Sequence, residues 1–256
     1  MDAAHAHSST VSDTITITAT ASGPCTEFRV FYGLRSGGGT FTWAVDGGSA
    51  SSVNTDAVSD SGGVLSITGL TAGTHTLVLT VTNAGTAGVI LCGVACINTA
   101  VAGVRLDKLG NSGAQASHFT GVPSPIWMQQ LSGLAPDLTI IEFATNEMSA
   151  NVTPAVYAAN IQTIIERARG AAPDTCVLLV SPADNGLTGK AHTMAEYRDA
   201  LRDLAVAQGC AWLDLYEIVG PYSAANARSL YGDTAHINAA GGQLLARELY
   251  ERLLRL

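Results

Sequence analysis

Apolar and polar side chains alternate with a period of two through much of the first hundred residues, a pattern typical of half-buried β-strands. Glycine-rich turns such as Gly37-Gly38-Gly39 separate the runs and allow tight reversals. A longer polar stretch, 47–63, predicts a loop. No helical period interrupts this series, so we expect a β-sandwich over 11–98, after a polar N-terminal segment, 1–10. The expected strands are 14–20, 28–32, 40–45, 64–68, 76–81 and 89–97.

From about residue 99 short apolar strands alternate with amphipathic segments of helical length. Pro154 opens one such helix after Thr153, and Gly170 ends it. This alternation predicts a parallel sheet with helices on both faces. Residues 99–256 are therefore expected to be a three-layer α/β/α domain that follows the sandwich. The expected strands are 101–106, 138–143, 176–180 and 211–215, and the expected helices are 154–170, 194–208 and 239–256.

The chain has 256 residues, 47% of them hydrophobic, which is enough to bury a substantial core. Lys and Arg number 13 against 21 Asp and Glu, a formal net charge of −8. A negative field repels phosphate backbones and anionic lipids, so nucleic acid and membrane surfaces are disfavoured as partners. No apolar run approaches the ~18–20 residues of a membrane helix, so no membrane insertion is expected. A homo-oligomer is compatible with the sequence.

The five cysteines include no Cys-x-x-Cys motif and no Cys/His cluster at metal-ligand spacing. Cys92 and Cys96 are four residues apart, which places them about 13 Å apart in a strand, too far for a disulfide. We therefore expect both to be buried free thiols, and the cysteines imply no metal site.

Asp233 and His236 lie in a turn directly before the last expected helix. An Asp three residues before a His can accept a hydrogen bond from the imidazole Nδ1–H, which leaves Nε2 to act as a general base. The alternative interpretation makes Asp233 a turn residue and His236 a surface residue.

Two further positions lie where a parallel sheet places its ligand site, beyond the carboxyl ends of strands. Asn146 follows the expected strand 138–143, and its side-chain amide is suited to donate to a developing oxyanion. Gly113 follows the strand 101–106, in a turn that exposes backbone N–H groups. A purely structural turn is the alternative at each position.

Taken together, these segments resemble the SGNH or GDSL hydrolases. Residues 109–114 resemble the family's second block, 136–147 the third, and Asp233-Thr-Ala-His236-Ile-Asn-Ala-Ala-Gly the fifth. The resemblance implies that Gly113 and Asn146 form the oxyanion hole, that Asp233 orients His236, and that His236 is the base. It implies no metal or organic cofactor. Ala144 replaces a common glycine, and Glu147 replaces a common Asp.

The first block of that family, which carries the nucleophilic serine, is not found. One interpretation places that block upstream, with the sandwich inserted between the first and second blocks. A second recruits Ser112, Ser8 or Ser9, of which Ser112 is kept as the candidate nucleophile. A third is that catalysis has been lost and recognition kept.

The function expected from the resemblance is a serine esterase or acetylesterase that acts on, or recognises, acylated glycans or lipids. Tyr32 and Trp43 are candidates for stacking on sugar rings, although aromatic residues in strands also serve as core. The alternatives are a non-catalytic glycan-binding adhesin or phage-tail-type structural protein, and a transport or lectin-like module. We expect low or no turnover from this chain, and an extracellular, cell-surface or virion-associated location.

Overall fold

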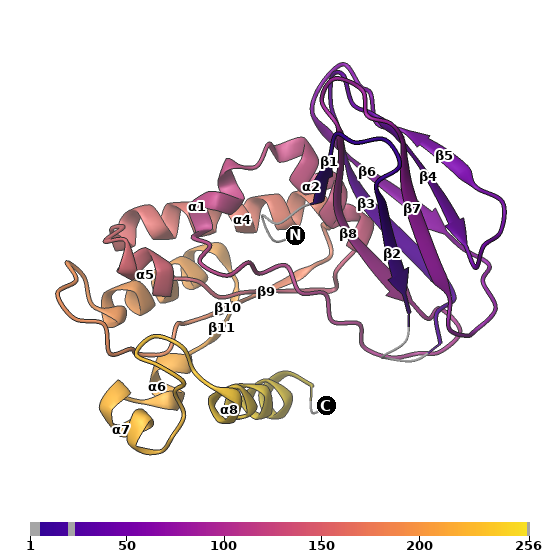
Figure 1. Ribbon diagram of the computed structural model, residues 1–256. Coiled ribbons are helices and arrows are strands. Elements are labelled where there is room, and N and C mark those ends of the chain that lie inside the picture. Colours follow the sequence, from indigo (N-terminus) through magenta and orange to yellow (C-terminus); the bar gives the residue numbers. More distant parts are fainter. Residues whose placement is uncertain (1–5, 20–23, 255–256) are drawn as a thin grey trace. The chain divides into compact units, whose positions relative to one another are not determined.

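The structure is a computed structural model that describes residues 6–19 and 24–254 (Figure 1). Its contacts divide the chain into two compact units. The β unit comprises Met1–Ser112, Gly121–Pro136 and Gly170–Ala172, and the α/β unit comprises Gly113–Thr120, Asp137–Arg169 and Pro173–Leu256. Residues 1–5 of the expected N-terminal segment, and residue 20 of the first expected strand, lie outside the described residues.

The β unit contains two antiparallel sheets of four strands each, in the orders β1-β8-β3-β6 and β2-β7-β4-β5 (Figure 1). This order over eight strands is that of a jelly roll, so the predicted sandwich is confirmed. The strands are β1 (Ala6–Ser8), β2 (Thr14–Thr18), β3 (Glu27–Leu34), β4 (Thr40–Val45), β5 (Ser51–Asn54), β6 (Ser61–Ile67), β7 (Thr76–Asn83) and β8 (Val89–Ile97).

Alternation along the strands builds the core of the sandwich. In β7 the side chains of Leu77, Leu79 and Val81 are buried, while the residues between them face outward. Phe28 and Phe41 are the largest fully buried side chains of this core.

The polar stretch 47–63 contains a strand, β5, where we expected a loop throughout. Its residues pair with β4, with Phe41 opposite Val53. Val53 is the one apolar residue of the strand. An edge strand of this kind is held by backbone hydrogen bonds, so its sequence needs little apolar alternation.

Helix α2 (Ser124–Leu134) belongs to the β unit and packs on β6 and β3. Gln129 Oε1 accepts a hydrogen bond from the Gly62 backbone N–H at 2.8 Å, and Gln130 Nε2 donates to the carbonyl of Tyr32 at 3.2 Å. Gly62 and Gly63 leave room for this contact and for the Tyr32 ring, because a Cβ at either position would overlap a neighbour.

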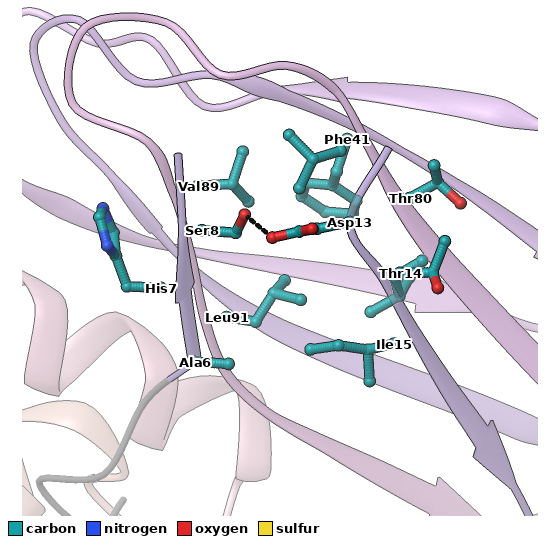
Figure 2. A pocket seen from close by; sticks show the side chains of 12 residues that line it. Ala6, His7, Ser8, Asp13, Thr14, Ile15, Phe41, Thr80, Val89 and Leu91 are labelled. Atoms are coloured by element: carbon teal, nitrogen blue, oxygen red, sulfur yellow. Dashed lines mark hydrogen bonds between the residues drawn. The ribbon is translucent and has the colours of Figure 1, made fainter. Parts of the chain in front are cut away.

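A cleft of about 260 Å³ opens between the sheets beside the edge strands β1 and β2 (Figure 2). Its floor is apolar and includes Phe41 and Leu91. At its rim the hydroxyl of Ser8 donates a hydrogen bond to Asp13 Oδ2 at 2.6 Å.

The α/β unit is built on a parallel sheet in the order β11-β10-β9, which confirms the predicted α/β class. Its strands are β9 (Leu138–Ile141), β10 (Cys176–Val180) and β11 (Ala211–Leu213). The helices are α1 (Ala116–Gly121), α3 (Thr145–Ser149), α4 (Pro154–Ala171), α5 (Met194–Gln208), α6 (Leu215–Val219), α7 (Tyr222–Ala227), α8 (Ala239–Leu249) and a π-helical turn η1 (Tyr250–Leu254).

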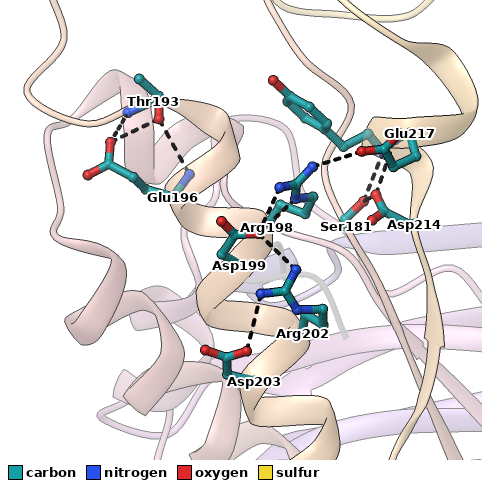
Figure 3. A network of polar contacts seen from close by, with 10 residues as sticks. Ser181, Thr193, Glu196, Arg198, Asp199, Arg202, Asp203, Asp214 and Glu217 are labelled. Atoms are coloured by element: carbon teal, nitrogen blue, oxygen red, sulfur yellow. Dashed lines mark hydrogen bonds and ion pairs between the residues drawn. The ribbon is translucent and has the colours of Figure 1, made fainter.

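Helix α5 has the ends that its sequence predicts. Thr193 and Glu196 form a capping box at its start, in which Thr193 N–H donates to Glu196 Oε2 at 2.6 Å (Figure 3). Gly209 ends the helix in the left-handed conformation. Beyond the helix, the Ser181 hydroxyl donates to Asp214 Oδ1 at 3.0 Å and joins the end of β10 to the start of α6.

The strand expected at 101–106 is absent, which is a correction to the sequence analysis. Val101, Val104 and Leu106 are 65%, 89% and 87% exposed, and this stretch pairs with no strand among the described residues. An apolar run becomes a strand only where a neighbouring strand accepts its backbone hydrogen bonds. β9 is correspondingly an edge strand within the described part of the sheet.

The cysteines differ from expectation in burial. Cys92 is half-buried and Cys96 is exposed, although both lie in β8, an inner strand of its sheet. In the described part of the chain, no helix is long and apolar enough to cross a membrane.

Candidate active site

The Asp233–His236 turn is closed on itself by hydrogen bonds. His236 Nδ1 lies 2.9 Å from Asp233 Oδ2, the contact that the spacing predicts. Asp233 Oδ1 also accepts the backbone N–H groups of Ala235 and His236, at 2.7 and 2.8 Å. Gly232 N–H donates to the carbonyl of His236 at 2.9 Å, and Tyr231 and Ile237 form a β-bridge across the base of the turn.

These contacts fix the charge of Asp233. The hydrogen bond from Ala235 N–H, followed by those from the His236 side chain and backbone, lowers the pKa of Asp233 to about 2. Its carboxylate is therefore ionised at neutral pH and orients the imidazole. The His236 side chain is 72% exposed, so solvent can reach it.

A second set of contacts joins the Gly113 turn to the start of α3. Asn146 Nδ2 donates to the carbonyl of Ala114 at 2.9 Å, and Gln115 Nε2 donates to the Asn146 carbonyl at 3.3 Å. Gly113 has a φ of +75°, which favours glycine. The structure thus brings together two predicted positions that are 33 residues apart in the sequence.

The loop after β10 connects these segments to the Asp233–His236 turn. Gly186 N–H donates to the carbonyl of Thr234 at 2.7 Å, and the neighbouring Asn185 Nδ2 contacts Met148 Sδ of α3 at 3.4 Å. Asn185 was not singled out by the sequence, because its role depends on contacts between distant loops. All three predicted segments therefore belong to one connected group of loops in the α/β unit.

A nucleophilic hydroxyl is not found beside the imidazole. Among the described residues, no serine or threonine hydroxyl is hydrogen-bonded to His236. Ser112 is an exposed turn residue, and the Ser8 hydroxyl is bonded to Asp13 in the β unit. Ser112 therefore stays a prediction.

The two candidate sugar-stacking residues are partly buried in the β unit. Tyr32 and Trp43 both pack against the sandwich core, and the Tyr32 ring meets Phe41 edge to face at 5.5 Å. These contacts are those of packing residues, and stacking on a sugar stays a prediction.

No group of three or more His, Cys, Asp or Glu side chains in the described residues could hold a metal ion. What the α/β unit does contain is a carboxylate-oriented imidazole together with the amide of Asn146 and the Gly113 turn. In a parallel α/β fold, these are the parts that the resemblance to the SGNH class implies for its site.

Comparison with known proteins places the chain in a family. The model of the GDSL-like lipase/acylhydrolase family matches residues 93–244, more than half of the chain, and the chain belongs to this family. A search of curated protein sequences finds no significant match.

Several solved structures are similar in fold. A peptidoglycan O-acetylesterase matches with a TM-score of 0.59 and 16% identity, over 99% of this chain and 78% of that protein. A family two carbohydrate esterase from Clostridium thermocellum has a TM-score of 0.43 and 18% identity, over 96% and 93% of the two chains. An acetyl-xylooligosaccharide esterase from Geobacillus has a TM-score of 0.45 and 19% identity, over 56% and 69%.

Proposed function

We propose that the α/β unit hydrolyses acyl esters of glycans, with His236 as the general base. The observation that carries the proposal is the Asp233–His236 contact of 2.9 Å, in a turn linked to the segment that holds Asn146. An ionised Asp233 favours the tautomer with a proton on Nδ1, which leaves the Nε2 lone pair available to accept a proton.

The chemistry follows from these groups. A hydroxyl oxygen attacks the ester carbonyl carbon while His236 Nε2 takes the hydroxyl proton. The carbonyl electron pair moves to oxygen, and the resulting oxyanion accepts hydrogen bonds from Gly113 N–H and the Asn146 amide. When the tetrahedral intermediate collapses, the alcohol leaves with the proton from His236. If the attacking hydroxyl is a serine, water releases the acyl group from it by the same steps.

In this proposal the attacking serine belongs to the family's first block. That block would form a strand that pairs with the open edge of β9. β9 is an edge strand of the parallel sheet among the described residues, so its outer edge pairs with none of the described strands. Ser112 is the competing source. Without a serine, His236 can activate only water, so turnover by this chain is expected to be low.

The acylated glycan is proposed from the fold similarity to a peptidoglycan O-acetylesterase, which identifies the first substrate class to try. A non-catalytic glycan-binding or structural role is the competing function. It predicts binding to the same glycans with no ester cleavage.

The test measures p-nitrophenol release from its acetate, and acetate release from O-acetylated peptidoglycan, by the chain and by a His236→Ala variant. His192→Ala is a matched control, because His192 also pairs with a carboxylate, Glu196 at 3.2 Å, on the same unit. We expect slow hydrolysis that falls to the buffer rate in His236→Ala and is unchanged in His192→Ala. Equal rates for the chain and His236→Ala would reject the esterase for this chain.

A second measurement locates the nucleophile. The chain is treated with a fluorophosphonate, which modifies activated serines, and the labelled peptide is mapped. Labelling at Ser112 that disappears in Ser112→Ala would assign the nucleophile to Ser112 and reject the strand proposed beside β9.

A further inference from the structure

Glu147 is a buried carboxylate that connects two distant segments of the candidate site. Only 2% of the residue is exposed. Its Oε1 accepts the backbone N–H of Ala116 at 2.6 Å, and its Oε2 accepts the backbone N–H of Ala144 at 3.0 Å. Ala116 follows the Gly113 turn, and Ala144 lies directly before α3. One side chain thus bonds to both segments that are assigned to the oxyanion hole.

The backbone at Ala144 is strained. Its φ is +109° and its ψ is −27°, a region that residues with a Cβ rarely adopt, and the residue is 1% exposed. Strain of this kind persists only where surrounding contacts impose it. The bond from Ala144 N–H to Glu147 is such a contact, and it fixes the direction in which the chain enters α3 and presents Asn146.

Helix capping alone does not account for a buried carboxylate at this position. α3 has only five residues, and the bond to Ala116 crosses 31 residues of sequence. A buried carboxylate is costly unless its oxygens accept hydrogen bonds, and hydrogen bonds to a charged acceptor are stronger than neutral ones. Glu147 therefore holds the two segments in one arrangement more firmly than the neutral bond between Asn146 and Ala114 does alone.

We infer that Glu147 is the positioning residue of the oxyanion hole: it holds the Gly113 turn and Asn146 so that both donors point at one oxygen. This inference rests on the proposed function, since the hole is defined by that reaction. Glu147 does not touch substrate in this role. It acts through the backbone N–H groups of Ala116 and Ala144.

The test compares Glu147→Gln with Glu196→Gln. Gln has the size of Glu, but its NH₂ group cannot accept, so one of the two N–H groups loses its partner. Glu196 is a matched control because it also accepts from the residue three before it, Thr193 N–H at 2.6 Å, at a helix start. Among the described residues its side-chain hydrogen bonds reach only the nearby His192 and Thr193. Either substitution removes a helix-capping interaction. Only Glu147→Gln also weakens the contact that holds the Gly113 turn and Asn146 in the oxyanion hole.

Two readouts are taken from the same proteins. The first is the His236-dependent hydrolysis rate, the difference between the chain and His236→Ala. We expect Glu147→Gln to lower it by ~10-fold or more at saturating ester with KM unchanged, because small misplacements of catalytic groups are costly. The second is the NMR signals of the Gly113 backbone amide and the Asn146 side-chain amide. We expect both signals to shift in Glu147→Gln and to stay in place in Glu196→Gln.

A further variant, Glu147→Asp, keeps the charge but is one methylene too short to reach both amides. We expect it to shift the same two amide signals. That result would show that the shifts come from the length of the side chain and not from the loss of its charge. If Glu147→Gln leaves both amide signals and the rate unchanged while the protein stays folded, the inference is wrong. If His236→Ala has no effect on hydrolysis, the proposed function fails, and the amide signals alone then report whether Glu147 holds the two segments together.

Discussion

The imidazole of His236 is held by Asp233 on one side only. His236 Nδ1 lies 2.9 Å from Asp233 Oδ2, whereas Nε2 has no hydrogen-bond partner among the described residues. A base that is oriented at one nitrogen and open at the other is the arrangement that general-base catalysis requires.

Asp233 should stay ionised well below the ordinary range of an aspartate. Its pKa is lowered to about 2, mainly by the bond from Ala235 N–H. A lowered pKa gives stability that is present above the unfolded value and is lost as pH falls through about 2. The NMR signals of the Ala235 and His236 backbone amides should therefore not follow an aspartate titration between pH 3 and 5. A midpoint near 4 in both signals would contradict the contacts of this turn.

Ala144→Gly should stabilise the protein. Ala144 has a φ of +109°, where glycine carries no steric penalty. We expect a gain of about 1 kcal/mol in the free energy of unfolding in urea, after the greater entropy of glycine in the unfolded chain is allowed for. Ala150→Gly, at a φ of −88°, is the control and should give no gain. A loss of stability in Ala144→Gly would argue against the strained turn.

The β unit should lose stability as pH rises through and above neutrality. His75 is buried, and its Nδ1 and Nε2 lie 2.6 Å from Asp46 Oδ2 and from the carbonyl of Thr71. Both partners accept hydrogen bonds, so both ring nitrogens must donate, and only the protonated imidazolium can do so. The hydrogen bond to Asp46, followed by that to Thr71, raises the pKa of His75.

For a raised pKa, the stabilisation is complete below the unfolded value and disappears as pH rises through the folded value. We expect the difference in unfolding free energy between the chain and His75→Gln to be largest in mild acid and to shrink as pH rises above about 6.5, the ordinary histidine value. Urea unfolding of both proteins at several pH values measures it. A difference that does not change with pH would mean that His75 is neutral in the fold.

Gly63→Ala should destabilise the β unit. A Cβ at Gly63 would lie 2.2 Å from the ring of Tyr32, which is packed edge to face against Phe41. Overpacking of this kind typically costs ~1–3 kcal/mol. Gly93→Ala is the control, because a Cβ there meets nothing within 4 Å. Thermal unfolding of both variants checks this, and equal melting temperatures would contradict the packing of Tyr32.

The sequence predicts elements best where local pattern and local chemistry agree. Strand β4 and helix α5 have the bounds that the sequence predicts, because alternation marks the strand while Thr193 and Gly209 mark the helix ends. The run 101–106 has the pattern of a strand, but pattern cannot say whether a neighbouring strand is present. β5 was missed for the opposite reason, since its pairing with β4 compensates for a polar sequence.

The candidate site likewise contains some contacts that the sequence predicts and others that depend on the fold. The contact between Asp233 and His236 follows from a spacing of three residues, so it can be read directly from the chain. The contact of Asn146 with Ala114 joins helix α3 to the turn after Gly113. Only their places after expected strands and the family resemblance suggested that the two segments lie together. In the sequence, Glu147 differs from its neighbours only in that it replaces an Asp that is common in the family. Its bond to Ala116 depends on the fold.

The central claim is that His236 and Asn146 serve one reaction. A double-mutant cycle in p-nitrophenyl acetate hydrolysis tests it most directly, with His236→Ala, Asn146→Ala and the double variant compared with the unmodified chain. Groups that act as a unit are strongly non-additive. We expect each single variant to reduce hydrolysis and the double variant to be no slower than His236→Ala alone. An Asn146→Ala variant or a His236→Ala variant that is as fast as the unmodified chain would contradict a shared site.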